Sequence, residues 1–176
     1  MNFRDLTADD IELRIQSVKK NGLILLLYKN ARVDMAILDE TVGAENWQRE
    51  HYECKGNLFC RVGINTNYAN DNFGAKWIWK SDCGTESNTE AQKGEASDSF
   101  KRACFNWGIG RELYTSPFIW IGEDKCNISD GKCYDKFIVE KIKIENKQIT
   151  GLAIINETKK QRCFVWQKQN ETGVKQ

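Results

Sequence analysis

The stretch TEAQKGEASDSFKRACFNW, residues 89–107, is the strongest helical pattern in this sequence of 176 residues. Its apolar side chains recur at helical spacing, and they are Ala96, Phe100, Ala103, Cys104 and Trp107. Thr89 is a suitable N-cap residue, and Gly108 is a natural helix stop. The pattern therefore predicts a long amphipathic helix that buries one side against the rest of the protein.

The polar side of this predicted helix carries positive charges. Lys93 and Lys101 share a helix face with Ser97, and Arg102 stands next to that face. From Lys101 to Arg111 the sequence has three basic residues and no acidic residue. Cations in the last turns also stabilise a helix through its dipole, so these charges are typical of a well-formed helix as well as of a surface that binds polyanions.

The rest of the chain predicts an α+β fold with an antiparallel β-meander packed against the long helix. Before that helix we expect two helices, over residues 6–18 and 30–41, and a buried strand over 22–28. The predicted meander has strands over 47–54, 58–64 and 75–80. After the helix, an extended edge segment over 113–121 precedes a small C-terminal β-hairpin or meander with strands over 137–144, 149–155 and 162–167.

We divide the chain into a core domain over 1–122, a C-terminal β appendage over 123–168 and a flexible tail over 169–176. The formal net charge is only +1, so a polyanion would have to meet a local basic patch. The seven cysteines contain no C-x-x-C pair and the chain has one histidine, so we expect no metal site. No apolar run approaches ~20 residues, so we expect a soluble intracellular protein with reduced thiols and no membrane contact.

The residue types argue against most catalytic chemistries. His51 is the only histidine, and no phosphate-binding loop of the G-x-x-x-x-G-K-S/T type is present. A nucleophile pair made by Ser97 and Lys101 is conceivable, although residues four apart more often simply share a helix face. Scattered aspartates could assemble a magnesium site, and they are Asp9, Asp10, Asp34, Asp39 and Asp82. Cations near aromatic residues, with no catalytic set, suit single-stranded nucleic acid held by its backbone.

Four blocks of sequence resemble a known family. They are RVDMAILDETVGAENW (32–47), CRVGI (60–64), WIWKSDCG (77–84) and KGEASDSFKRACFNWGIGRELY (93–114). In this order and spacing they resemble the single-strand annealing recombinases of the Rad fifty-two type, in particular versions carried by phages and prophages of low-GC Gram-positive bacteria. The resemblance covers about residues 10 to 121.

This resemblance implies a ring or arc of subunits that lays single-stranded DNA in a positive groove and anneals complementary strands without ATP, cofactor or catalytic residue. Lys101 and Arg102 match the paired basic residues of the family's long helix, and Arg14 matches another groove arginine. The family's third helix cation falls at Phe105, where Arg111 or Lys93 could compensate. A second, outer DNA contact would fall near Lys55.

The leading hypothesis is therefore an ATP-independent DNA-binding and strand-annealing protein for homologous recombination and DNA repair, in the cytoplasm of a bacterial host. Its expected partners are single-stranded DNA, further copies of the chain, and helpers such as a single-strand binding protein or an exonuclease. Two alternatives belong to other classes. One is a non-catalytic adaptor that keeps the fold without the groove, and the other is a metal-dependent nuclease built from the scattered aspartates.

Overall fold

The computed structural model describes residues 1–69, 74–85 and 91–169, with the backbone alone for residues 91–93. Contacts divide the chain into two compact units. The helix–meander unit contains Met1–Asp5 and Asn30–Gly110, and the sheet unit contains Leu6–Lys29 and Arg111–Gln176. The predicted division into a core over 1–122, an appendage and a tail stays a prediction, because these units group residues by contact and not by independent folding.

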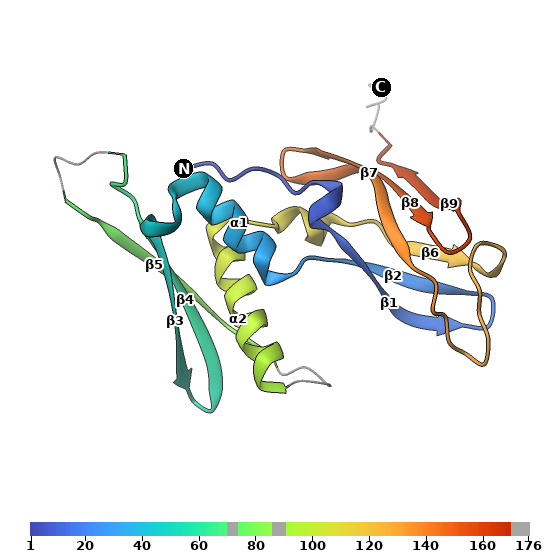
Figure 1. Ribbon diagram of the computed structural model, residues 1–176, viewed down its shortest axis with the longest axis horizontal. Coiled ribbons are helices and arrows are strands. Elements are labelled where there is room, and N and C mark those ends of the chain that lie inside the picture. The colour runs from blue at the N-terminus through green and yellow to red at the C-terminus, as the bar shows by residue number, and fades with distance from the viewer. Residues whose placement is uncertain (70–73, 86–90, 170–176) are drawn as a thin grey trace, which may run out of the picture. The chain divides into compact units, whose positions relative to one another are not determined.

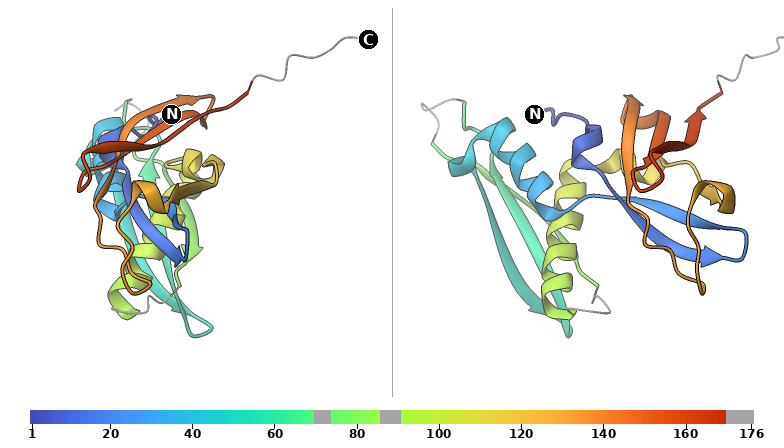
Figure 2. Two further views of the ribbon diagram at one scale, coloured as in Figure 1. Left: turned by 90° about the vertical axis from the view of Figure 1, so that its right-hand side faces the viewer. Right: turned by 45° about the vertical axis from the view of Figure 1, so that its right-hand side comes forward.

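The helix–meander unit is a three-stranded antiparallel sheet with both helices on one side (Figures 1 and 2). Its helices are α1 (Ala31–Val42) and α2 (Ala91–Trp107), and a short 3-10 helix follows α1 at Ala44–Asn46. Its strands are β3 (Trp47–Cys54), β4 (Asn57–Asn65) and β5 (Trp77–Cys83), paired in the order β3-β4-β5. The predicted meander that leads into a long helix is therefore confirmed.

The core of this unit lies between β4 and α2. Alternate residues of β4 point at the helix and are completely buried, namely Cys60, Val62 and Ile64. Opposite them, α2 buries Phe100, Ala103 and Cys104, which belong to the apolar stripe predicted from the sequence. Trp107 closes the last turn by donating a hydrogen bond from Nε1 to the Val62 carbonyl at 3.0 Å. The predicted cap at Thr89 lies outside the described residues.

Helix α1 begins and ends where the sequence predicts. The side chain of Asn30 caps its N-terminus by accepting a hydrogen bond from the Arg32 backbone N–H at 2.9 Å. Gly43 ends the helix with a φ of 84°, a conformation that a side chain would make unfavourable. No helix among the described residues is long and apolar enough to cross a membrane.

The sheet unit is a six-stranded antiparallel sheet in the order β6-β2-β1-β7-β8-β9. Its strands are β1 (Glu12–Lys19), β2 (Gly22–Tyr28), β6 (Ile119–Gly122), β7 (Phe137–Glu145), β8 (Gln148–Asn156) and β9 (Gln161–Gln167). The predicted C-terminal meander is present as β7-β8-β9. It continues the sheet of the N-terminal hairpin, which it joins where Glu12 pairs with Ile138.

The helix predicted over residues 6–18 is wrong. The structure has a short 3-10 helix at Ala8–Asp10 and then strand β1. The apolar residues Leu13 and Ile15 alternate with the exposed residues Glu12 and Arg14, which also fits a strand. Pairing with the very apolar strand β2 decides between the two patterns, because it satisfies the backbone of both strands and gives the apolar side a buried partner.

The segment predicted as extended over 113–121 is only partly a strand. Residues Arg111–Thr115 form a 3-10 helix, and β6 begins at Ile119. As predicted, β6 lies at the edge of its sheet, where it pairs with β2 alone. Pro117 stands between the two elements, where its missing N–H breaks no ladder hydrogen bond.

Candidate nucleic-acid interface

Lys101 and Arg102 are consecutive residues of α2, and both are half-buried. The buried residues Phe100 and Ala103 flank this pair in the sequence and fix the orientation of the helix against the meander. The pair therefore lies where the core side of α2 meets its polar side. A rigid helix holds the two cations at a constant spacing, as a site for a regular phosphate backbone requires.

Arg102 is anchored by an acid one turn earlier on the same helix. Its Nε donates a hydrogen bond to Asp98 Oδ2 at 2.9 Å, and its side chain is 43% exposed. The same carboxylate oxygen accepts two hydrogen bonds from Thr85, from its N–H and its Oγ1, each at 3.1 Å. Asp98 thus orients the guanidinium, and it also offsets part of the positive charge that a polyanion would meet.

Two more of the predicted cations belong to the helix–meander unit. Lys55 lies in the turn between β3 and β4, where it is exposed and has a φ of 54°. Lys93 lies in the first turn of α2, and its side chain is outside the described part of the structure. Four of the six predicted residues are therefore in one unit, and the structure places Lys101 and Arg102 side by side.

Arg14 and Arg111 belong to the sheet unit. Arg14 projects from β1, and its guanidinium carbon lies 3.3 Å from the centre of the Tyr28 ring on β2. Its Nη2 is 3.7 Å from Glu12 Oε2. Arg111 is exposed at the start of the 3-10 helix that precedes β6. The structure therefore groups Arg14 with an aromatic ring on its own sheet.

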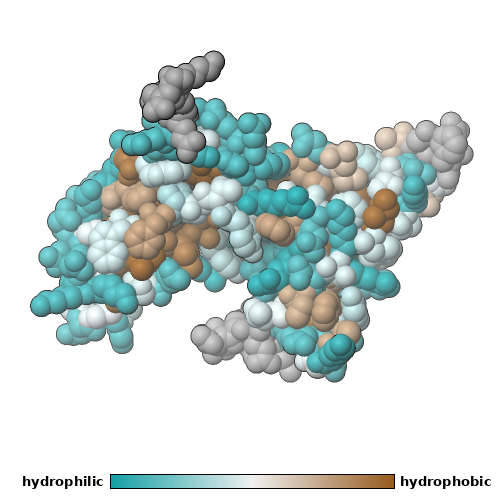
Figure 3. Space-filling view, turned by 180° about the vertical axis from the view of Figure 1, so that it is seen from behind, coloured by the Kyte–Doolittle hydropathy of each residue, from teal (hydrophilic) through white to brown (hydrophobic). Residues whose placement is uncertain are grey.

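Exposed apolar side chains lie on the same face of the sheet unit as Arg14. The register pairs Arg14 with Leu26, which is 47% exposed, and pairs Ile24 with Trp120 on the edge strand β6. Phe118, just before β6, is 70% exposed. Figure 3 shows hydrophobic side chains gathered over part of the sheet unit, on the left in that view. Arg14 thus belongs to a surface that is partly apolar and aromatic.

Sequence reasoning missed two residues that contact predicted DNA-binding cations, one beside Arg102 and one beside Arg14. Asp98 could have been found, because it precedes Arg102 by four residues in a predicted helix, the spacing of a helical ion pair. Tyr28 could not, because its contact with Arg14 depends on the register of the β1–β2 hairpin.

The residues that favoured other chemistries have structural partners. His51 Nε2 lies 3.1 Å from the Ala96 carbonyl of α2. Asp39 Oδ1 accepts a hydrogen bond from Trp47 Nε1 at 2.6 Å, and Asp82 Oδ2 accepts one from Asn106 at 3.2 Å. Across residues 1–69, 74–85 and 91–169, no group of three or more His, Cys, Asp or Glu side chains is placed to hold a metal ion.

All seven cysteines are free thiols. Burial is the main cause that raises the pKa of Cys60, Cys126 and Cys163 to about 11. The positive charge of Arg49 opposes this rise at Cys60. These three sulfurs are therefore protonated at neutral pH, which makes them poor nucleophiles and poor metal ligands.

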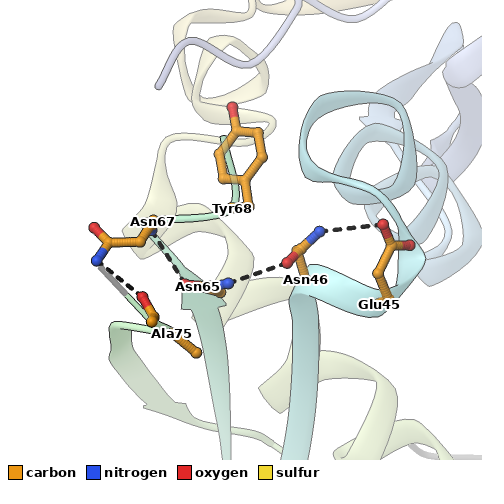
Figure 4. Close-up of a pocket in the computed structure, with 7 residues that line it drawn as sticks. Glu45, Asn46, Asn65, Asn67, Tyr68 and Ala75 are labelled. Carbon is orange, nitrogen blue, oxygen red and sulfur yellow. Dashed lines mark hydrogen bonds between the residues drawn. The ribbon is translucent and has the colours of Figure 1, made fainter. Parts of the chain in front are cut away.

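A polar pocket of about 370 Å³ lies at the end of β4 (Figure 4). Asn65 is its central residue, because its Oδ1 accepts hydrogen bonds from the backbone N–H groups of Asn67 and Lys76 at 3.1 and 3.0 Å. Its Nδ2 donates to Asn46 Oδ1 at 3.1 Å. The described residues that line the pocket include no lysine or arginine, so the pocket does not suit a DNA phosphate.

Comparisons with known proteins show the family of this chain. The model of the Rad52/22 family double-strand break repair protein matches residues 4–130, which is more than half of the chain. The matched range includes both helices, strands β1 to β6 and all six predicted DNA-binding residues. Neither the curated proteins nor the solved structures gave a match. This protein therefore belongs to the Rad52/22 family of double-strand break repair proteins.

Proposed function

We propose that the protein binds single-stranded DNA by its sugar–phosphate backbone and anneals complementary strands without ATP. The observation that carries this proposal is the pair Lys101 and Arg102 on a rigid helix, within the part of the chain that the family model matches. Two adjacent cations on a helix are suited to backbone phosphates, which carry no sequence information. A protein that anneals any complementary pair of strands needs this kind of sequence-independent contact.

A single protomer has too few cations to bind tightly. Each phosphate contact to a single strand contributes a slope of about −0.7 in the logarithm of the binding constant against the logarithm of salt concentration. The formal net charge of +1 adds no long-range attraction. We therefore infer that several copies bind one strand together in a ring or an arc, so that repetition of the Lys101–Arg102 pair supplies the affinity.

Annealing follows from this geometry without a chemical step. A strand held by its backbone leaves its base edges available to a second strand. The cations also reduce the repulsion between the two phosphate backbones. Helper proteins such as a single-strand binding protein or an exonuclease, a phage or prophage origin, and a location in the bacterial cytoplasm remain predictions from the sequence resemblance.

The proposal is tested with two complementary oligonucleotides that carry a donor and an acceptor dye, mixed without ATP or metal ions. We expect the protein to accelerate annealing and to bind the single strand less tightly as salt rises. Electron microscopy with and without DNA should show rings or arcs. A monomer without salt-dependent DNA binding would contradict the proposal and favour the adaptor. Strand cleavage that appears with magnesium and disappears with a chelator would favour the nuclease.

The ion pair between Asp98 and Arg102 leads to a prediction of increased affinity. Asp98→Asn removes one negative charge beside the proposed site, and its amide oxygen can still accept the hydrogen bonds from Thr85. We expect single-stranded DNA to bind about threefold more tightly at 0.1 M salt, with a steeper salt dependence. Fluorescence anisotropy of a labelled oligonucleotide measures both quantities.

The matched control for this change is Asp130→Asn. Asp130 is exposed in the sheet unit and has a φ of 51°, which asparagine tolerates well. This variant changes the net charge by the same amount at a different place. Equal gains in affinity from both variants would show that net charge, and not the site on α2, controls DNA binding.

A further inference from the structure

The β3–β4–β5 meander has a second face, opposite the one that packs on α2. We call it the outer face and define it by Tyr52, Phe59, Arg61, Gly63, Trp77 and Trp79. The register places Tyr52 opposite Phe59 and Trp79 opposite Gly63. The buried residues Cys60, Val62 and Ile64 alternate with these positions along β4 and point at α2. Within the described residues of this unit, α1 and α2 both lie on the other side of the sheet (Figures 1 and 2).

One end of the outer face carries a stacked aromatic pair. The rings of Tyr52 and Phe59 are 5.6 Å apart and are inclined by only 22°. Tyr52 lies on the edge strand β3 and is 40% exposed. The pair therefore presents aromatic ring faces on which a planar ligand can stack.

The other end of the outer face carries two tryptophans. A methyl group built on Gly63 would lie 2.8 Å from ring atoms of Trp79, so the indole lies across the sheet where Gly63 leaves room for it. The rings of Trp77 and Trp79 are 6.3 Å apart and tilted by 32°. Gly63 thus explains how a large indole can lie flat in the centre of a meander instead of projecting from it.

Arg61 lies between the two aromatic pairs. Its guanidinium carbon is 4.6 Å from the centre of the Trp79 ring, and its Nη2 forms an ion pair with Glu50 at 2.6 Å. Because Glu50 neutralises this arginine, the outer face is not a phosphate groove like the one proposed on α2. The side chains that the outer face presents are flat π-systems, and the guanidinium group of Arg61 is one of them.

We propose that the outer face stacks nucleobases of single-stranded DNA, as a contact separate from the backbone contact at Lys101 and Arg102. This inference rests on the proposed function. Base stacking on aromatic and arginine planes tolerates any sequence, because every base has a π-face. Phe59, in one aromatic pair, and Gly63, which lies opposite Trp79 of the other pair, are four positions apart on β4, or about 13 Å of strand. A strand of DNA with about 3.4 Å per stacked base can therefore reach both ends of the face.

The same face suits another protein surface less well. A second protomer that covered it would enclose the ion pair between Glu50 and Arg61, whose side chains are 50% and 46% exposed. Removing two charges from water costs more than their attraction returns unless further hydrogen bonds are supplied. A base stacked on the rings leaves the edges of this ion pair in contact with water.

The test separates base stacking from backbone binding. Affinity is measured for oligo(dT) and for an oligomer of the same length made of abasic sites, which has the same phosphates and no bases. We expect the wild-type protein to bind oligo(dT) at least about fivefold more tightly. Tyr52→Thr, and the double variant Tyr52→Thr/Trp79→Thr, should bring this ratio towards one and leave the salt slope unchanged. Threonine is chosen because it is well accommodated in strands.

The control is Tyr134→Thr, which removes a tyrosine that is 85% exposed in the sheet unit. It should keep the wild-type ratio. If the double variant fails to fold, the single variant at the exposed Tyr52 still decides the outcome. Photocrosslinking of wild-type protein to a 4-thiothymidine strand provides a second measurement, with the crosslink expected on the peptide that contains Tyr52.

Three results would overturn the inference. If wild-type protein binds both oligomers equally and with a normal salt slope, the outer face does not stack bases, and the proposed function stands. If the ratio is unchanged in the variants while light scattering shows smaller assemblies, the face is a contact between copies of the chain. If wild-type protein binds neither oligomer, the proposed function fails together with this inference.

Discussion

Lys101→Ala/Arg102→Ala is expected to lower the affinity for single-stranded DNA by about 25-fold at 0.1 M salt, because each lost phosphate contact accounts for about fivefold over one decade of salt. Annealing should slow in parallel, since the proposed mechanism requires the backbone contact at Lys101 and Arg102. Both side chains are half-buried on the polar border of α2, so their removal leaves the buried stripe of the helix intact. Anisotropy titrations between 0.05 and 0.5 M salt would measure the affinity and should show a slope smaller by about 1.4.

The control variant also removes two positive charges, but from the sheet unit. Lys136 and Lys143 have side chains that are 75% and 63% exposed in the sheet unit, and each forms an ion pair with a glutamate. Lys136→Ala/Lys143→Ala should leave DNA affinity within about twofold of wild type, since exposed ion pairs contribute little. An unchanged salt slope in the Lys101→Ala/Arg102→Ala protein would defeat the assignment of the site to α2.

Phe100→Ala is expected to lower the free energy of unfolding of the helix–meander unit by about 3–5 kcal/mol, through the lost transfer energy and the cavity it leaves. Phe100 is completely buried between α2 and the meander. Its ring is 6.1 Å from the ring of Trp47, and the guanidinium carbon of Arg49 lies 4.8 Å from its centre. Domains of this kind have a total stability of about 5–15 kcal/mol, so the variant should be close to unfolding at 37 °C.

Urea unfolding followed by tryptophan fluorescence would measure this loss. Phe118→Ala serves as the control, because Phe118 is 70% exposed and its removal should change stability by less than about 0.5 kcal/mol. A loss below about 1 kcal/mol for Phe100→Ala would mean that the α2–meander core is not packed as described. Loss of DNA binding at temperatures where this variant remains folded would instead imply that Phe100 has a direct role at the interface.

Local sequence patterns were sufficient for the elements with strong periodicity. The apolar stripe of residues 89–107 predicted α2, and the pattern over residues 30–41 predicted α1. The same reasoning failed over residues 6–18, where a short segment fits both a helical and an alternating pattern. The difference is physical, because a helix satisfies its own backbone whereas a strand depends on a partner that local sequence does not specify.

The candidate site shows the same limit. Lys101, Arg102 and the spacing from Asp98 to Arg102 could all be read from one helix. The stacking of Arg14 on Tyr28 could not, since it follows from the register of a hairpin. The neutralisation of Arg61 by Glu50 likewise requires the pairing of β3 with β4.

The sequence by itself determined the type and order of most elements, the basic pair on the long helix and the family to which the chain belongs. Only the tertiary structure decided that Glu12 pairs with Ile138, far along the chain, and that one face of the β3–β4–β5 meander presents aromatic rings. Periodicity encodes which side of an element is apolar. It does not encode which distant element covers that side, because strand pairing and burial depend on partners brought together only when the chain folds.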